Sequence, residues 1–125
     1  MRPWLLAGAV NGFLAIAAGA FAAHGLSGRI SPTALSWFET GARYHAYHAL
    51  ALLAIAALSR DLPAKGLWWL GLAAKLFLAG ILLFSGSLYA MALSGNRAFA
   101  LITPIGGLCF LAGWACLVVL GLRKA

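Results

Sequence analysis

The chain has 125 residues; 64% are hydrophobic, 9% are charged, and nine Lys or Arg stand against two Asp or Glu. Soluble domains are about half apolar and about a quarter charged, so this composition excludes an ordinary soluble domain. It also excludes a disordered chain, which has few apolar residues. The net charge of +7 does not indicate nucleic-acid binding, because the basic residues stand singly at the ends of apolar runs. The sequence therefore predicts a small integral membrane protein.

Four apolar segments approach the length of about 20 residues that a helix needs to cross a membrane. They are residues 4–23, 42–58, 67–93 and 98–122, and Gly, Pro, Ser or Asn occur in the breaks between them. Polar and apolar residues do not alternate along the chain, which excludes a membrane β-barrel. We therefore expect one transmembrane domain, residues 1–125, that folds as an all-α integral membrane four-helix bundle.

Residues 32–40 are polar enough to lie outside the hydrocarbon. Ser31 followed by Pro32 is typical of an N-cap followed by proline at the first helical position. We predict a short interfacial helix between spans 1 and 2. The alternative is that this segment extends the second span without a break. Thr103 followed by Pro104 repeats the N-cap pattern, which indicates a later start for the last helix.

The distribution of basic residues predicts an orientation. If the N-terminus is cytoplasmic, that side holds five of them (Arg2, Arg60, Lys65, Arg123, Lys124) and the other side holds three (Arg29, Arg43, Arg97). The positive-inside rule then predicts a multi-pass protein of the bacterial inner membrane with both termini in the cytoplasm. The first span could instead be a cleaved signal peptide ending near Ala22. We favour an uncleaved span, because the apolar run is long and carries glycines at helix-packing spacing.

In this topology most polar residues of the spans fall in the outer half of the bundle, and such residues usually face its interior and mark a site. This candidate polar cluster comprises His24, Arg43, Tyr44, His48, Ser85, Ser87, Tyr89 and Thr103. The functional interpretation is a ligand-binding or proton-handling group. The structural interpretation, which we favour for His48, is a buried side chain bonded to a neighbouring helix.

Small residues allow membrane helices to approach closely. Gly8 and Gly12 form a G-x-x-x-G pair in the first span, and other glycines mark faces of the later spans. The predicted helix-packing positions are Gly8, Gly12, Gly19, Gly86, Gly106, Gly107 and Gly113.

Metal, haem and catalytic chemistry have weaker support. His24, His45 and His48 are the only histidines, and no carboxylate lies deep in a span to complete a metal site. A haem between two histidines would leave little room for the core of so small a bundle. A nucleophilic serine would need a base and a buried acid, and no such acid is present. We therefore expect no cofactor, no metal and no enzymatic activity.

Four ordered motifs together suggest a family: GAFAAHG at 19–25, YHAYHALALL at 44–53, LFSGSLY at 83–89 and ITPIGG at 102–107. The chain resembles the small bacterial membrane proteins of the YgdD/YwdK type, a family of unknown function. The resemblance implies four spans and an uncleaved first helix. His45 stands where glutamine is common in that family, and Ala22 stands where glycine is common. The first departure weakens any metal site that needs His45.

Three hypotheses follow for function. The first is a non-enzymatic accessory or assembly module that acts through helix packing, as a homo-oligomer or with a membrane-protein partner, among membrane lipids and without nucleic acid. The second is a small-molecule or lipid binder or transporter that uses the outer polar cluster. The third, a His-based metal or haem protein, ranks last.

Overall fold

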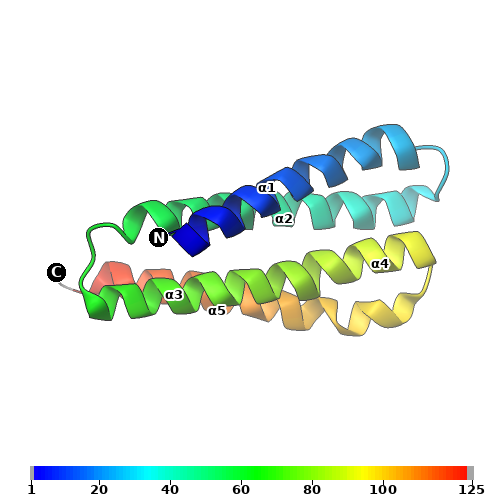
Figure 1. Ribbon diagram of the computed structural model, residues 1–125. Coiled ribbons are helices and arrows are strands. Elements are labelled where there is room, and N and C mark those ends of the chain that lie inside the picture. Colours follow the sequence, from blue (N-terminus) through cyan, green and yellow to red (C-terminus); the bar gives the residue numbers. More distant parts are fainter. Residues whose placement is uncertain (1, 124–125) are drawn as a thin grey trace.

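The computed structural model describes residues 2–123, which are almost entirely helical (Figure 1). The α-helices are α1 (Arg2–Phe21), α2 (Pro32–Leu58), α3 (Ala64–Gly80), α4 (Gly86–Ser94) and α5 (Thr103–Leu122). Two π-helical turns, η1 (Ala22–Leu26) and η2 (Ile81–Ser85), and one 3-10 segment, η3 (Arg97–Leu101), continue or join them. Within residues 2–123 no strand is present, so the expected all-α fold is confirmed for this range.

The short segments extend the α-helices into longer rods: η1 continues α1, η2 joins α3 to α4, and η3 leads into α5. Rods that follow one another in the chain run antiparallel (Figure 1). Three rods are long and apolar enough to cross a membrane: Arg2–Leu26, Ala64–Ser94 and Arg97–Leu122. They contain the first, third and fourth of the expected spans. The second expected span lies in α2, which is long but less apolar than the other rods.

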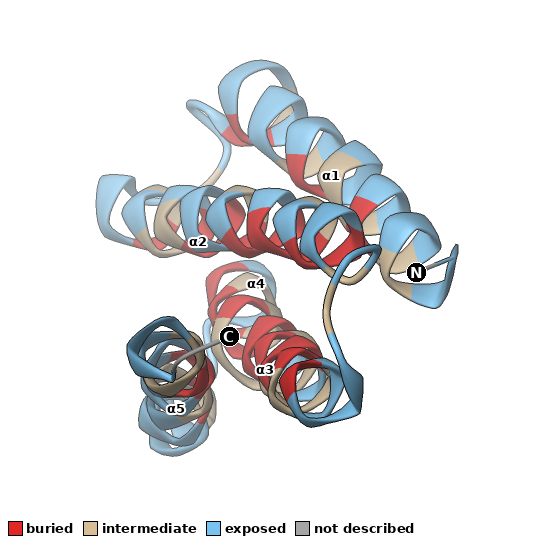
Figure 2. Ribbon diagram, turned by 90° about the vertical axis from the view of Figure 1, so that its left-hand side faces the viewer, coloured by how far each residue is buried: buried red, intermediate tan, exposed pale blue. Residues whose placement is uncertain are grey.

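Helix α2 is the central element of the fold. Figure 2 shows it between α1 on one side and α3, α4 and α5 on the other. Eleven of its residues are buried, compared with two in α1. Its two histidines are buried against neighbouring helices, whereas Glu39, Arg43 and Tyr47 are exposed.

The separate interfacial helix predicted at residues 32–40 is wrong. These residues and the expected second span form one continuous helix, α2, which is the alternative described above. Ser31 is the N-cap, as predicted, and its hydroxyl accepts a hydrogen bond of 3.1 Å from the Ala34 amide. Gly41 does not break the helix. A larger residue would not fit at this position, because a Cβ atom there would lie 2.9 Å from the ring of Tyr89.

The last rod begins with η3, and regular α-helix begins at Thr103 with Pro104 in the first turn. The late start of the α-helix is therefore confirmed, but Thr103 is not its N-cap. Ile102 occupies that position, and no side chain caps this helix. The Thr103 hydroxyl instead lies 2.5 Å from that of Ser87 on α4, which shows that an interhelical bond replaces the capping bond.

The apolar core lies where α2, α3 and α5 meet. Phe77, Leu52, Ile55 and Leu70 are almost fully buried there, each with at most 1% of its surface exposed. Burial of such side chains is worth about 1.5–3 kcal/mol each in water, but in lipid the gain comes from close packing instead. The positions of α2, α3 and α5 in this region are therefore determined by how closely these side chains fit together.

Most of the predicted packing glycines do face another helix. A Cβ atom at Gly8 would lie 2.8 Å from the side chain of Leu53, and one at Gly113 would lie 2.5 Å from Phe77. At Gly106 it would collide with the backbone of Leu83 and Phe84. Gly12 and Gly107 have looser contacts, at 3.9 Å from Ala49 and 3.8 Å from Phe84.

Gly19 and Gly86 were wrongly assigned to close packing. No atom lies within 4 Å of a Cβ atom at Gly19, and at Gly86 only the Ile81 carbonyl of the same rod lies in range, at 3.8 Å. Both glycines line open grooves, so their missing side chains leave space that no neighbouring helix fills. Gly41 and Gly80 were not predicted; Gly80 is pressed against the ring of Phe110.

Candidate functional site

The polar residues of the rods form three separate groups, not one cluster. The first joins α1, α2 and α4 through His45, the second joins α2 to α5 through His48, and the third joins α4 to α5 through Ser87. The two histidines are three residues apart on α2 but bond to different helices.

His45 is buried and bonds through both ring nitrogens. Its Nε2 lies 2.9 Å from Asn11 Oδ1, and its Nδ1 lies 3.0 Å from the Tyr89 hydroxyl. Asn11 Nδ2 donates to the Ala7 carbonyl at 2.8 Å, so its Oδ1 is the atom that faces His45. The amide oxygen can only accept. His45 Nε2–H is therefore the donor, and Nδ1 accepts from the tyrosine in a neutral ring.

His48 is buried with the opposite tautomer. Its Nδ1 donates to the Tyr44 carbonyl at 2.7 Å, and its Nε2 accepts from Trp114 Nε1 at 3.0 Å. The imidazole is stacked on Phe110 with 3.6 Å between ring centroids and 6° between planes, and it meets Phe77 edge-on. Because an indole nitrogen only donates, His48 is held as a neutral ring in an aromatic enclosure.

The hydroxyl groups of α4 have mixed environments. Ser87 is buried, bonds Thr103, and also donates to the Phe84 carbonyl at 2.9 Å. Ser85 is fully buried, yet its hydroxyl has no hydrogen-bond partner within residues 2–123. An unpaired buried hydroxyl carries a desolvation cost, though a smaller one for a helix already in lipid.

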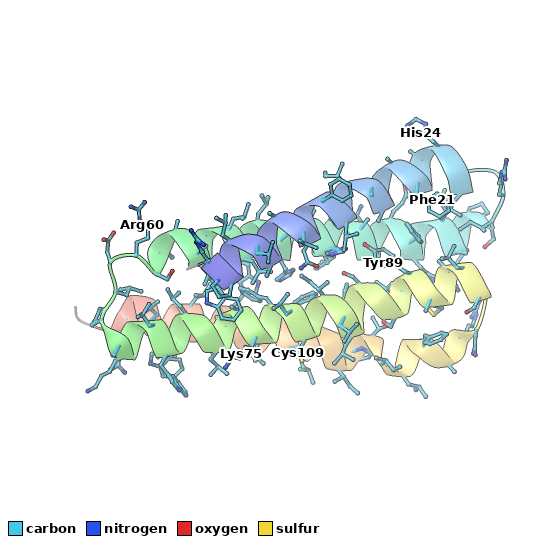
Figure 3. All side chains as sticks on the ribbon, in the orientation of Figure 1. Phe21, His24, Arg60, Lys75, Tyr89 and Cys109 are labelled. Atoms are coloured by element: carbon cyan, nitrogen blue, oxygen red, sulfur yellow. The ribbon has the colours of Figure 1, made fainter. Side chains whose placement is uncertain are left out.

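Three further predicted members lie outside these groups. His24 is exposed on η1 and points away from the other helices (Figure 3). Arg43 is also exposed, and it donates to the Thr40 hydroxyl at 3.3 Å. Tyr44 is 38% exposed, and its ring contacts Tyr47 and Phe84 instead of a polar partner. The outer cluster is therefore incomplete, because these side chains face outward.

The histidines do not converge on a metal position. His24 is exposed on η1, and the ring nitrogens of His45 and His48 already have partners. Residues 2–123 contain no group of three or more His, Cys, Asp or Glu side chains that could hold a metal ion.

The His45 group borders an open groove of about 290 Å³. Its walls are α1, through Asn11 and Leu14, and the rod that includes Leu82 and Gly86; His45 and Tyr89 also line it. Ligand pockets usually have volumes of about 300–1,000 Å³, so this groove is at the lower limit. It could hold a thin apolar group next to the polar side chains.

Sequence reasoning did not include Asn11, His45 or Trp114 in the polar cluster. Asn11 carried a usable signal, because a single amide in an apolar span requires a hydrogen-bonding partner on a neighbouring helix. The bond to His45, near the middle of α2, extends the polar region beyond the predicted outer half. Trp114 carried no such signal, since tryptophan is also common at membrane interfaces.

Comparison with known proteins identifies the family. The sequence model described as "Protein of unknown function (DUF423)" matches residues 18–107. The chain belongs to the DUF423 family. The DUF423 match contains both α2 histidines and leaves out Asn11 and Trp114.

Individual relatives match nearly the whole chain. The UPF0382 inner membrane protein YgdD of Escherichia coli K12 is 42% identical over 98% of this chain and 91% of its own length. The UPF0382 membrane protein YwdK of Bacillus subtilis is 41% identical over 98% of both chains. A UPF0382 membrane protein of Haemophilus influenzae is 48% identical over 87% of this chain and 85% of its own. No solved structure matches.

These matches confirm the resemblance to the YgdD/YwdK type and a membrane protein of a family with unknown function. Neither the family description nor the names of these relatives indicates an enzymatic activity.

Proposed function

We propose that the chain is a non-enzymatic accessory or assembly module of the bacterial inner membrane that acts through helix packing. The observation that supports this most is that both ring nitrogens of each buried histidine already have hydrogen-bond partners within the chain. Three of these four bonds reach another helix, and the fourth, from His48 to the Tyr44 carbonyl, lies within α2. These side chains are occupied in holding the fold together. Interaction with other molecules is then left to the outer surfaces.

Helix α1 offers the surface best suited to such contacts. It is buried only along the stripe that faces α2, where Gly8 and Ala15 lie. Its other side carries large apolar side chains, with Leu6, Phe13 and Ile16 exposed by 66%, 76% and 72%. In a membrane this surface meets either lipid or another helix, and our proposal assigns it to another helix.

Photocrosslinking in cells tests this assignment. A photoreactive amino acid at position 13 on α1 is expected to yield a discrete protein adduct, either a second copy or another membrane protein. The matched control is position 108 on α5, where Leu108 is exposed by 65%. Phe13→Ala with Ile16→Ala should abolish the native complex and leave helicity unchanged. Adducts with lipid alone, together with a monomer after gentle extraction, would contradict the proposal.

We also propose that α2 is a fourth span and that both termini are cytoplasmic. Support comes from the 27-residue length of α2, which corresponds to about 40 Å, and from its place between the membrane-capable rods. The basic-residue count favours the same orientation. A C-terminal green fluorescent protein fusion should fluoresce, whereas a C-terminal alkaline phosphatase fusion should be inactive. The reverse result would contradict this orientation.

A second candidate function is the binding of a small amphiphile, favoured by the groove next to Asn11, His45 and Tyr89. Gly86→Leu would fill this groove, because no other rod approaches that position. Gly71→Leu, at another glycine with free space, is the control. A ligand that stabilises the unmodified chain and Gly71→Leu but not Gly86→Leu would support this function. No stabilisation across an amphiphile screen would contradict it.

A further inference from the structure

One cleft lies between the end of α2, the start of α3 and the end of α5. These helix ends come together at one end of the bundle (Figure 1). The cleft has a volume of about 540 Å³, within the usual range for ligand pockets. Leu62, Leu117 and Leu120 provide apolar walls, and Lys65 and Arg123 lie at the polar end with Asp61.

The composition of the cleft matches an amphiphilic anion. Lys65 is the second residue of α3, and Arg123 directly follows α5, so both cations lie where these rods end. Rod ends in a membrane protein lie near the level of the lipid headgroups. Within residues 2–123, neither cation forms an ion pair with Asp61 or another carboxylate. The lining of the cleft therefore combines two basic residues and one acidic residue with apolar side chains.

The start of α3 adds hydrogen-bond donors to the same place. Its N-cap is Pro63, and no side chain caps the helix. The first amides of a helix lack partners within it and favour anions, phosphate in particular. Pro63, Lys65 and Gly66 all line the cleft. The free amides of α3 and the two basic residues therefore all favour an anionic ligand in this cleft.

We propose that this cleft binds one anionic phospholipid. The headgroup phosphate is held by Lys65, Arg123 and the first turn of α3, and an acyl chain lies against Leu117 and Leu120. The charge complementarity favours an anionic over a zwitterionic lipid. The apolar walls favour a lipid over free phosphate. This site is independent of the proposed partner surface on α1.

The test uses the full chain reconstituted in vesicles of equimolar phosphatidylglycerol and phosphatidylcholine. After gentle detergent extraction, native mass spectrometry should show one retained phosphatidylglycerol per chain. A basic residue near a membrane surface contributes about 1 kcal/mol to the attraction of anionic lipid, which is about five-fold in affinity. Lys65→Gln and Arg123→Gln are each expected to lower the affinity by about this factor, and the double variant by about 25-fold.

Arg60→Gln is the matched control for charge. Arg60 lies at the same end of the bundle but outside the cleft, and its side chain points away from the helices (Figure 3). Its substitution should change phosphatidylglycerol affinity by less than about two-fold, because only the general surface attraction is lost.

A second pair of variants tests the apolar slot. A Cβ atom at Gly121 would meet nothing within 4 Å, so Gly121→Leu fills the cleft without a clash. It should reduce lipid retention at least ten-fold, whereas Gly71→Leu should not. Circular dichroism of both variants checks the fold.

Three results would overturn the proposal. They are equal retention of phosphatidylcholine, unchanged phosphatidylglycerol retention in the double charge variant, and binding of inorganic phosphate alone that is as tight and unaffected by Gly121→Leu. The last would indicate a site for soluble phosphate. A partner complex through α1 can persist in each case, so failure here is distinct from failure of the proposed function.

Discussion

The two faces of α2 hold their neighbours in different ways. On one face, His45 meets α1 and α4 through an amide and a phenol, beside an open groove. On the other, His48 is stacked on Phe110 and bonded to Trp114 in an aromatic enclosure. The polar contacts of the first face have an open groove beside them, whereas aromatic rings fill the space around His48 on the second face. The comparison predicts that the contacts of His45 contribute less to stability than those of His48.

The largest expected effect is at the contact between α5 and η2, the rod segment against which α5 packs. Gly106→Ala would place a methyl group against the backbone of Leu83 and Phe84, which cannot move aside as a side chain can. We expect a loss of about 3 kcal/mol or more in the free energy of unfolding, at the upper end of overpacking effects. The measurement is equilibrium unfolding in mixed micelles.

Gly107→Ala is the control for Gly106→Ala, because its added methyl group would make an ordinary contact of 3.8 Å with Phe84. It should change the free energy of unfolding by less than about 0.5 kcal/mol, like other substitutions without a clash. Equal effects of the two substitutions would show that α5 can shift away from η2, and the close contact at Gly106 would then not fix its position.

His48→Ala is expected to have the next largest effect. It removes the stack on Phe110, leaves a cavity, and deprives Trp114 Nε1 of its acceptor. We expect a loss of about 2–3 kcal/mol in the same unfolding assay. His48→Phe keeps an aromatic ring against Phe110 and loses the hydrogen bonds, so it should lose about 1 kcal/mol, less than His48→Ala. The comparison would be wrong if His48→Ala cost no more than His45→Ala.

His45→Ala should have a smaller effect, because the groove lies next to the side chain and lipid can fill the space. Two interhelical hydrogen bonds at about 0.6 kcal/mol each predict a loss of about 1 kcal/mol. His45→Gln can still donate and accept, and should recover part of that loss. Tyr89→Phe should cost about 0.6 kcal/mol alone and nothing in the His45→Ala background. An unchanged cost in that background would show that Tyr89 acts without His45.

Much of the fold could be predicted from the sequence, because apolar runs and helix breakers are local signals. The all-α class, the cap at Ser31 and the late α-helix start at Thr103 depend on neighbouring residues alone. The continuity of α2 through Gly41 could not be predicted in this way. Nor could the close contact of Gly41 with Tyr89, which lies 48 positions further along the chain.

The candidate site was less predictable, because helix rotation decides which polar residues meet. His45 and His48 share a similar side of an ideal helix, yet one reaches α1 and α4 while the other reaches α5. His24 was expected to join them, but η1 carries it outward. Glycine spacing alone also cannot distinguish a close contact, as at Gly8, from the open groove at Gly19.

The smallest expected effect tests the distinction between the close contact at Gly8 and the open groove at Gly19, both on α1. Gly19→Ala adds a methyl group that meets no atom, and alanine is favoured over glycine in a helix by about 1 kcal/mol. Stability should therefore stay within about 0.5 kcal/mol or rise slightly. Gly8→Ala, eleven residues earlier in the sequence, would press on Leu53 and should lose about 1 kcal/mol. If Gly19→Ala destabilises the chain as strongly as Gly8→Ala, then α1 lies closer to α2 along its whole length, and the difference between the two faces of α2 is smaller than the contacts indicate.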